Sequence, residues 1–138
     1  MTRPYASGVR TFAAIYNDLV DGIRENTNLL VRRFSEPRAS YPKYPVVEVV
    51  PVDMSFIEDM VLEQFLASVR FSVLIALTAK DAGASNIYTY LSSVLDAISA
   101  LDEKYNVKVE AIEFQEDVLS TPAVHAARIS VVIDGEIS

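Results

Sequence analysis

The side chains best suited to chemistry in this chain are one histidine and several carboxylates. His125 is the only histidine. It falls on the apolar face of a predicted strand, so we interpret it as a structural residue rather than a metal ligand or general base. Paired carboxylates can exchange protons or hold a divalent cation, and four of them lie close together: Glu110, Glu113, Glu116 and Asp117. Their spacing lacks the mid-loop glycine of a calcium loop and favours a solvated acidic surface.

Other patterns that would support catalysis or cofactor binding are missing from the sequence. The chain has no cysteine, which excludes disulfides, thiolate zinc sites and cysteine nucleophiles. Its four glycines form neither a phosphate-binding loop nor a dinucleotide fingerprint, and no Gly-x-Ser-x-Gly motif is present. A second set of carboxylates is also interpreted as solvated: Asp53, Glu58, Asp59 and Glu63. We therefore expect no catalytic residue, no metal and no cofactor.

The charge of the chain disfavours several classes of partner. The sequence has 12 Lys and Arg against 19 Asp and Glu, a net charge of -7. This balance disfavours tight binding to a nucleic-acid backbone or to an anionic membrane surface. The one basic pair, Arg32 and Arg33, forms a small positive patch with Arg38 and Lys43. That patch is either solvated or contacts an acidic partner surface.

Length and hydropathy predict one domain without a membrane span. The 138 residues correspond to a single domain that buries about two thirds of its unfolded surface. The longest strongly apolar run, Phe71–Ala79, is much shorter than the about 20 residues of a spanning helix. The first residues lack the apolar core of a signal peptide. We expect a soluble protein that is made and used in a cytoplasm.

Hydrophobic periodicity predicts two helices and four strands. Apolar side chains recur at three- and four-residue steps from Ser7 to a point between Glu25 and Leu30, and again over Asn86–Tyr105, as is typical of amphipathic helices. Alternating side chains predict strands at Val46–Val50, Val61–Thr78, Val107–Phe114 and Ala123–Ile133. Short connections favour antiparallel pairing of sequential strands. The predicted fold is α+β, with an about four-stranded, mostly antiparallel sheet packed against two helices.

Prolines and polar residues predict the segments between these elements. Val31–Tyr44 contains several prolines and is expected to be a connector on the surface. The strand Val46–Val50 should end at Pro51, near a sheet edge. The next segment, Asp53–Glu58, should form a helical turn or an irregular loop.

Strand alternation also predicts which side chains share a face. In the third strand, Ile112 and Phe114 are expected to face one side of the sheet, and Val109 and Ala111 the other. After the fourth strand, Asp134–Gly135 should turn the chain out of the sheet.

The order of these elements resembles tail terminator proteins of tailed bacteriophages, also called tail completion or head–tail joining proteins. Such proteins begin with an amphipathic helix and a proline-containing connector. A strand with a hydrophobic-Pro-x-Val start follows, here Tyr44-Pro45-Val46-Val47-Glu48-Val49-Val50-Pro51. Then come a polar loop, here Val52–Met60, and a long alternating strand, here Arg70–Leu77. A second helix leads to two closing strands, so the resemblance covers nearly the whole chain, residues 1–138, as a pattern.

This resemblance implies a structural role without catalysis. Such proteins form a ring, typically six-fold, on the last ring of a tail tube, where they end tube polymerisation and dock the tail to the neck or connector. The implied partners are further copies of the chain, the tail tube protein and the neck protein. Genome DNA would pass through the lumen without specific binding, because carboxylates repel phosphates. The implied location is the virion, after assembly in the host cytoplasm.

An interaction surface is predicted at the start of the long strand. The segment Val61–Ala67 is expected to overhang the sheet with unpaired backbone and large apolar side chains, which mark an association surface. We predict that the contact with another subunit or with the tube lies there and in the preceding loop. The candidate residues are Phe56, Ile57, Val61, Leu62, Phe65 and Leu66, together with Arg32 and Arg33.

Two other functional classes fit the same sequence. The first is another phage neck or baseplate component, or a generic protein-interaction module, and stacking on tail tubes would discriminate it. The second is a small ligand-binding domain or enzyme on an α+β fold. That class requires an apolar pocket with convergent polar groups.

Overall fold

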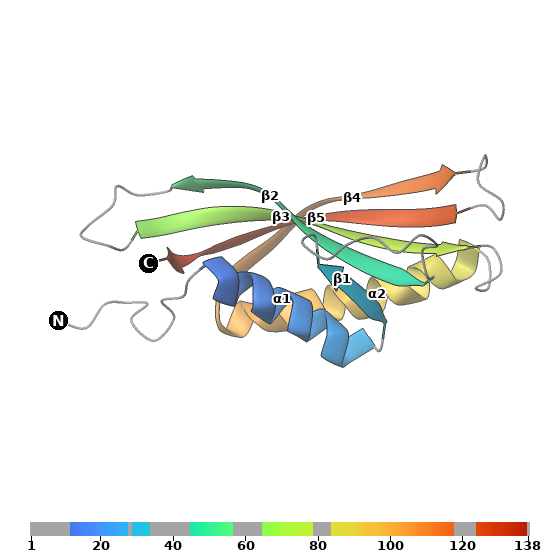
Figure 1. The fold of residues 1–138 in the computed structure, drawn as a ribbon, viewed down its shortest axis with the longest axis horizontal. Helices are drawn as coiled ribbons and strands as arrows, with labels where there is room; N and C mark the ends of the chain where they lie inside the picture. The colour runs from blue at the N-terminus through green and yellow to red at the C-terminus, as the bar shows by residue number, and fades with distance from the viewer. Residues whose placement is uncertain are drawn as a thin grey trace.

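Two helices lie against one face of a twisted sheet (Figure 1), and the hydrophobic core joins side chains of both layers. The computed structural model of the protein describes residues 12–27, 29–33, 45–56, 65–78, 84–117 and 124–137. Alternate side chains of the long central strand point toward the helices, and the largest of them, Phe71, Ile75 and Leu77, have no exposed surface. The apolar alternation of this strand therefore assigns one face of the sheet to the core, as predicted.

Five strands are described: β1 (Leu30–Arg33), β2 (Val46–Phe56), β3 (Phe65–Thr78), β4 (Asn106–Asp117) and β5 (Val124–Ile137). They form one sheet in the order β1-β2-β3-β5-β4. β1 pairs with β2 in parallel, whereas the other three pairs are antiparallel. The predicted α+β class is confirmed, but the sheet is mixed and has one strand more than predicted.

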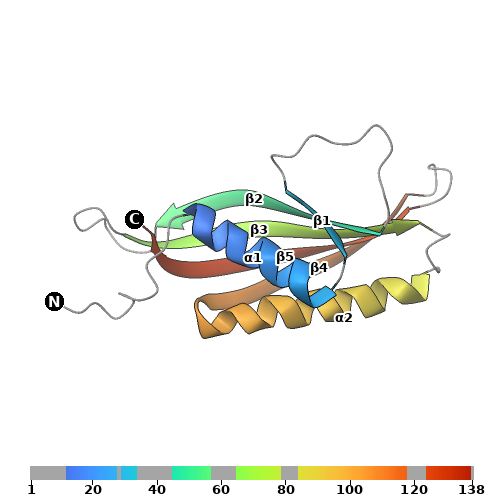
Figure 2. The same ribbon diagram turned by 60° about the horizontal axis from the view of Figure 1, so that its bottom comes forward.

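Both helices cover the same face of the sheet (Figure 2). They are α1 (Phe12–Thr27) and α2 (Ala84–Ala100), and α2 continues into the short 3-10 helix η3 (Leu101–Glu103). Their apolar stripes pack against the sheet as the periodicity predicted. Six apolar side chains of β3 and α2 belong to one core, with Leu95 only partly buried at its margin: Phe71, Val73, Ile75, Leu91, Leu95 and Ile98.

Tyr16 anchors α1 to the sheet. Its ring stacks against the ring of Phe71 in β3, with 6.0 Å between the ring centroids. The Phe12 ring also stacks against the Phe71 ring, with a centroid distance of 6.1 Å. The Tyr16 hydroxyl donates a 2.6 Å hydrogen bond to the carbonyl oxygen of Val49 in β2. Since this buried hydroxyl has an acceptor, Tyr16 holds α1 over β2 and β3 without leaving the hydroxyl unsatisfied.

The first strand lies in a segment that was predicted to be a connector. Leu30–Arg33 pairs in parallel with Val46–Val49, so the prediction of a connector from Val31 is wrong for residues 31–33. Val31 is buried, but the strand has only four residues and two of them are arginines. So short an alternation cannot be distinguished from a loop by periodicity. Residues 34–44 lie outside the described part of the chain.

β2 is longer than predicted because it contains a β-bulge. The strand continues past Pro51 to Phe56, with a shift of register between Pro51 and Asp53. The predicted turn or loop is therefore wrong for residues 53–56, and residues 57 and 58 lie outside the described part of the chain. Pro51 lies beyond the end of the pairing with β1, so its position near an edge agrees with the prediction.

A second bulge changes the faces of β4. The register with β5 shifts between Val109 and Ala111. Because a bulge inserts one extra residue, Val109 lies on the same face as Ile112 and Phe114, which corrects the predicted arrangement. β5 also differs from expectation at its end, where it continues past Asp134–Gly135 to Ile137.

Candidate assembly surface

Exposed hydrophobic side chains of the described residues lie along the two sides of the sheet. One group, here called the β2 margin, comprises Leu30, Val50, Val52 and Met54, and the other, here called the β4 margin, comprises Tyr88, Val109 and Phe114. Tyr88 belongs to α2, but its ring lies 5.7 Å from that of Phe114. None of these large exposed hydrophobics lies on α1 or on the central strands β3 and β5. Exposed hydrophobic surface that gathers at particular places marks an interaction site.

Both margins also carry unpaired strand edges within the described residues. β1 pairs only with Val46–Val49 of β2, so Val50–Phe56 has β3 on one side and no described strand on the other. β4 is the last strand of the sheet and pairs with β5 alone. Free strand edges present N–H and C=O groups that can pair with another chain. Hydrophobic patterns in the sequence do not reveal these margins, because the margins depend on the order of the strands.

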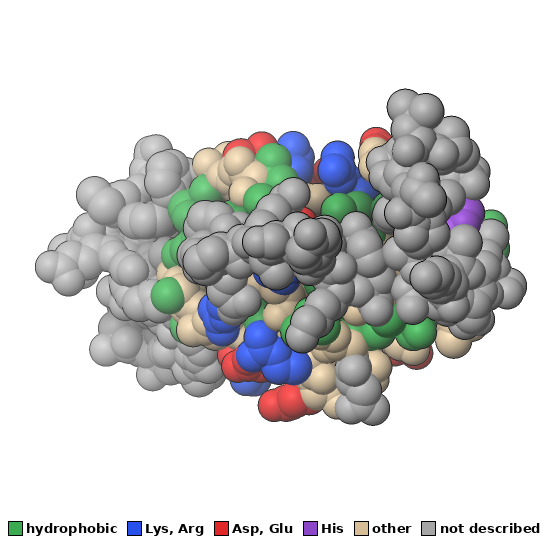
Figure 3. Space-filling view, turned by 45° about the vertical axis from the view of Figure 1, so that its right-hand side comes forward, with side chains coloured by type: hydrophobic (Ala, Val, Ile, Leu, Met, Phe, Trp, Pro, Cys, Tyr) green, Lys and Arg blue, Asp and Glu red, His purple; other side chains and the backbone are tan. Residues whose placement is uncertain are grey.

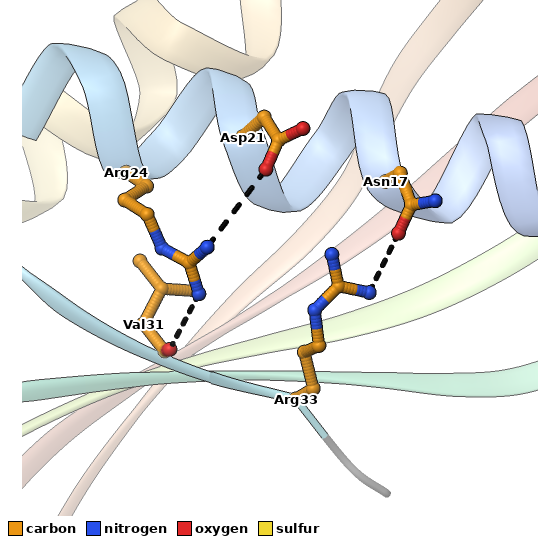
Figure 4. Close-up of polar contacts among 5 residues, drawn as sticks. All are labelled: Asn17, Asp21, Arg24, Val31 and Arg33. Carbon is orange, nitrogen blue, oxygen red and sulfur yellow. Dashed lines mark hydrogen bonds and ion pairs between the residues drawn. The ribbon is translucent and has the colours of Figure 1, made fainter. Parts of the chain in front are cut away.

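The edge of β1 is occupied by side chains from α1 (Figure 4). The Arg24 guanidinium donates a 3.3 Å hydrogen bond to the carbonyl oxygen of Val31 and lies 3.9 Å from the Asp21 carboxylate. Arg33 donates a 2.6 Å hydrogen bond to the side-chain oxygen of Asn17. The short strand is therefore tied to its own helix.

Arg32 and Arg33 do not form the solvated patch that the sequence suggested. Arg32 makes a 3.0 Å ion pair with Glu48 of β2, and only 12% and 15% of the two side chains are exposed. The Arg33 guanidinium carbon lies 5.5 Å from the centroid of the Tyr16 ring, a cation–π arrangement. Both arginines join β1 to its own subunit. Arg38 and Lys43 lie outside the described residues.

The face of the sheet opposite the helices carries a charged network. Arg70 of β3 lies 3.4 Å from the Asp53 carboxylate of β2 and 3.5 Å from the Glu110 carboxylate of β4. Both acidic residues lie at the bulges of their strands. Acidic and basic side chains also lie close together on the face drawn in Figure 3. The ion pair with Arg70 neutralises the charge of Glu110 locally, so this part of the surface carries mixed charge.

The predicted overhang of the long strand is only partly within the described residues. The backbones of Phe65 and Leu66 pair with Ile137 and Glu136 of β5, so the expectation of an unpaired backbone is wrong on that side. The pairing arises because β5 continues to Ile137 instead of turning out. On the other side of β3, the described pairing with β2 ends at Phe56 and Ala67. Phe56 is the last residue of β2. Ile57, Val61 and Leu62 lie outside the described residues, and an interface at these six positions stays a prediction.

The chemistry-bearing residues do not converge on one site in the described part of the chain. No group of three or more His, Asp or Glu side chains could hold a metal ion there. Glu110 is paired with Arg70, whereas Glu113 is exposed on β4. His125 is half-buried on β5, with Glu116 as its register partner on β4. No described helix is long and apolar enough to cross a membrane.

No protein-family model matches the chain, and the search of curated proteins gave no match either.

Proposed function

We propose that this chain is a structural virion protein that forms a ring at the head-proximal end of a phage tail tube. The ring ends tube polymerisation and docks the tail to the neck or connector. The proposal is supported by the resemblance of the element order to tail terminator proteins. The observation that carries it is the pair of exposed margins, which lie at opposite ends of the strand order β1-β2-β3-β5-β4.

Two different surfaces at opposite sides of one subunit suit a head-to-tail assembly. When one surface of each copy contacts the other surface of the next, the interface is heterologous, and such interfaces close into rings when the rotation permits. The expected ring is six-fold, as the resemblance implies. The tail tube protein and the neck protein are the partners on its two faces, and no enzymatic activity is part of this role.

The acidic character of the chain fits a ring around a DNA channel. Each copy adds a net charge of -7, and the accumulated negative charge disfavours phosphate-backbone contacts. DNA therefore passes through the lumen without specific binding. The same charge keeps the copies soluble until they meet a tube end.

Inactivating the coding sequence in the phage genome tests this proposal. Without a terminator, tube subunits keep adding to the growing end, so we expect overlong tails that lack heads. The length of the tails and the fraction joined to heads are measured by negative-stain electron microscopy. Expression of the wild-type chain from a plasmid should restore both.

The alternative roles give different images in the same experiment. Tails of normal length that carry heads would contradict the proposal. Tails of normal length without heads would assign the chain to another neck component, and the absence of tails would assign it to a baseplate or tube-initiation role.

A further inference from the structure

We propose that copies of this chain join by antiparallel pairing of Asn106–Ala111 in β4 of one copy with Val50–Ser55 in β2 of the next. This proposal rests on the ring proposed above and names the strands that close it. No described strand pairs with the outer edge of either segment. On the β4 edge, the Val107 N–H donates a 3.1 Å hydrogen bond to the Asp102 carboxylate of η3, and the Asp102 side chain must release this N–H when the ladder forms. Each edge carries exposed hydrophobic side chains: Val50, Val52 and Met54 on β2, and Val109 on β4.

Strand direction permits this pairing between copies in equivalent orientations. β2 is antiparallel to β3, β3 to β5, and β5 to β4, so β4 runs opposite to β2 within one subunit. When the next copy is placed beside β4 in a similar orientation, its β2 runs antiparallel to β4. The sheet then continues from one copy to the next without reversing a subunit, as a ring of equivalent copies requires.

The two bulges make the free edges equal in length. Across the sheet, one row of register partners runs through Val50, Ser72, Ser130 and Ala111, and another runs through Asp53, Arg70, Val132 and Lys108. Between these rows the central strands β3 and β5 have one residue each. In contrast, β2 has Pro51 and Val52, and β4 has Val109 and Glu110. The extra residue in one margin therefore matches the extra residue in the other, so the two edges can pair residue for residue.

The side chains that this register brings together are complementary. Lys108 lies opposite Asp53, and both side chains lie on the face away from the helices and are exposed. Val109 lies opposite Val52, which is 55% exposed, and Val107 lies opposite Met54. Opposite charges and apolar pairs directly across two strands are the combinations that stabilise sheets. Pro51 has no N–H, so the ladder lacks one donor at that position.

The ladder ends where β1 begins. β1 occupies the edge of β2 from Val46 to Val49, and the proposed pairing stops at Val50 and Ala111. The bulge of β4 lies at this point, and a bulge bends its strand. The bend therefore falls where β4 has to leave the ladder to pass β1 of the next copy.

Disulfide trapping tests the register, and the absence of native cysteine makes the result unambiguous. Asp53→Cys and Lys108→Cys are prepared as separate proteins, mixed and oxidised mildly. Directly opposed residues meet the distance requirement of a disulfide, so we expect a covalent dimer to form at least about tenfold faster than in the control mixture. The control mixes Asp53→Cys with Glu113→Cys, an exposed position on the same face of β4 five residues away. Thermal melts verify that all three variants are folded.

Each outcome decides the proposal. Rapid dimers in the Asp53→Cys and Lys108→Cys mixture alone support it, and the double variant Asp53→Cys/Lys108→Cys should then give oligomers larger than dimers. Equal rates in both mixtures would overturn it, as would Lys108→Cys dimerising equally fast by itself, because β4 would then pair with β4. If the Asp53→Cys and Lys108→Cys proteins cross-link but tails stay normal after the gene is inactivated, only the proposed function is refuted. If inactivation of the gene gives overlong tails but the two cysteine variants do not cross-link, only this strand pairing is refuted.

Discussion

Truncation of Phe71 to alanine is expected to lower the free energy of unfolding by about 3–5 kcal/mol. The Phe71 side chain has no exposed surface, and its ring stacks with both Phe12 and Tyr16 of α1. The substitution removes apolar contacts and leaves a cavity where α1 meets β3. Chemical denaturation monitored by circular dichroism measures the loss.

Phe114→Ala provides a matched control for this prediction. The change in side chain is the same, but Phe114 is 54% exposed at the β4 margin. We expect its loss of stability to stay below about 1 kcal/mol. Equal losses in the two variants would mean that the core does not lie on the face of β3 described above.

Replacement of Arg32 by methionine is expected to destabilise the chain by about 3 kcal/mol. Arg32 and Glu48 form an ion pair in which both side chains are mostly buried. Methionine keeps much of the volume but leaves the Glu48 carboxylate in a poorly solvated place without this guanidinium. The free energy of unfolding at neutral pH measures the effect.

Two further variants separate burial from charge in this prediction. Arg32→Met/Glu48→Met removes both charges and should recover stability to within about 1 kcal/mol of the wild-type chain, because a buried pair can be replaced by apolar groups. Arg70→Met makes the same substitution in a pair whose side chains are 44% and 55% exposed, and it should cost less than about 1 kcal/mol. A similar loss for Arg32→Met and Arg70→Met would contradict the role assigned to burial.

The sequence predicts the large elements of this fold because their periodicity is long. α2 follows a stripe of apolar side chains over several turns, and the alternation of β3 extends well beyond an ordinary strand. In β5, the predicted apolar face contains His125, Ala127, Ile129, Val131 and Ile133. The last four are fully buried, whereas His125 is half-buried. A repeated pattern of this length leaves little choice about which side chains face the core.

The errors occur where one residue interrupts a pattern. The end of β2 was predicted at Pro51 because proline usually ends a strand, whereas this strand continues through a bulge there. In β4 the extra residue of the bulge reverses the alternation, so Val109 was assigned to the wrong face. β1 was missed because Arg32 and Arg33 look like surface residues in a sequence, whereas the fold provides Glu48, Asn17 and Tyr16 as their partners. These partners are distant in the sequence, and no local signal identifies them.

The candidate surface could not be predicted from the chain alone for a similar reason. Whether β4 has a free edge depends on β5 lying between β3 and β4. Sequence patterns identify strands, but the order of strands in a sheet is set by tertiary packing. The alternation of apolar and polar residues over Val52–Phe56 was a usable signal for a strand beyond Pro51, although it does not say which edge is free.

The most direct test of the proposed role is the position of this chain in the assembled particle. Cryo-electron microscopy of virions from the genome that encodes it should reveal one ring between the tail tube and the neck. Its density should fit this five-stranded sheet with two helices and have six-fold symmetry, as the resemblance implies. Density for the chain at the distal tip of the tail, or its absence from purified virions that carry normal tails, would contradict the proposal.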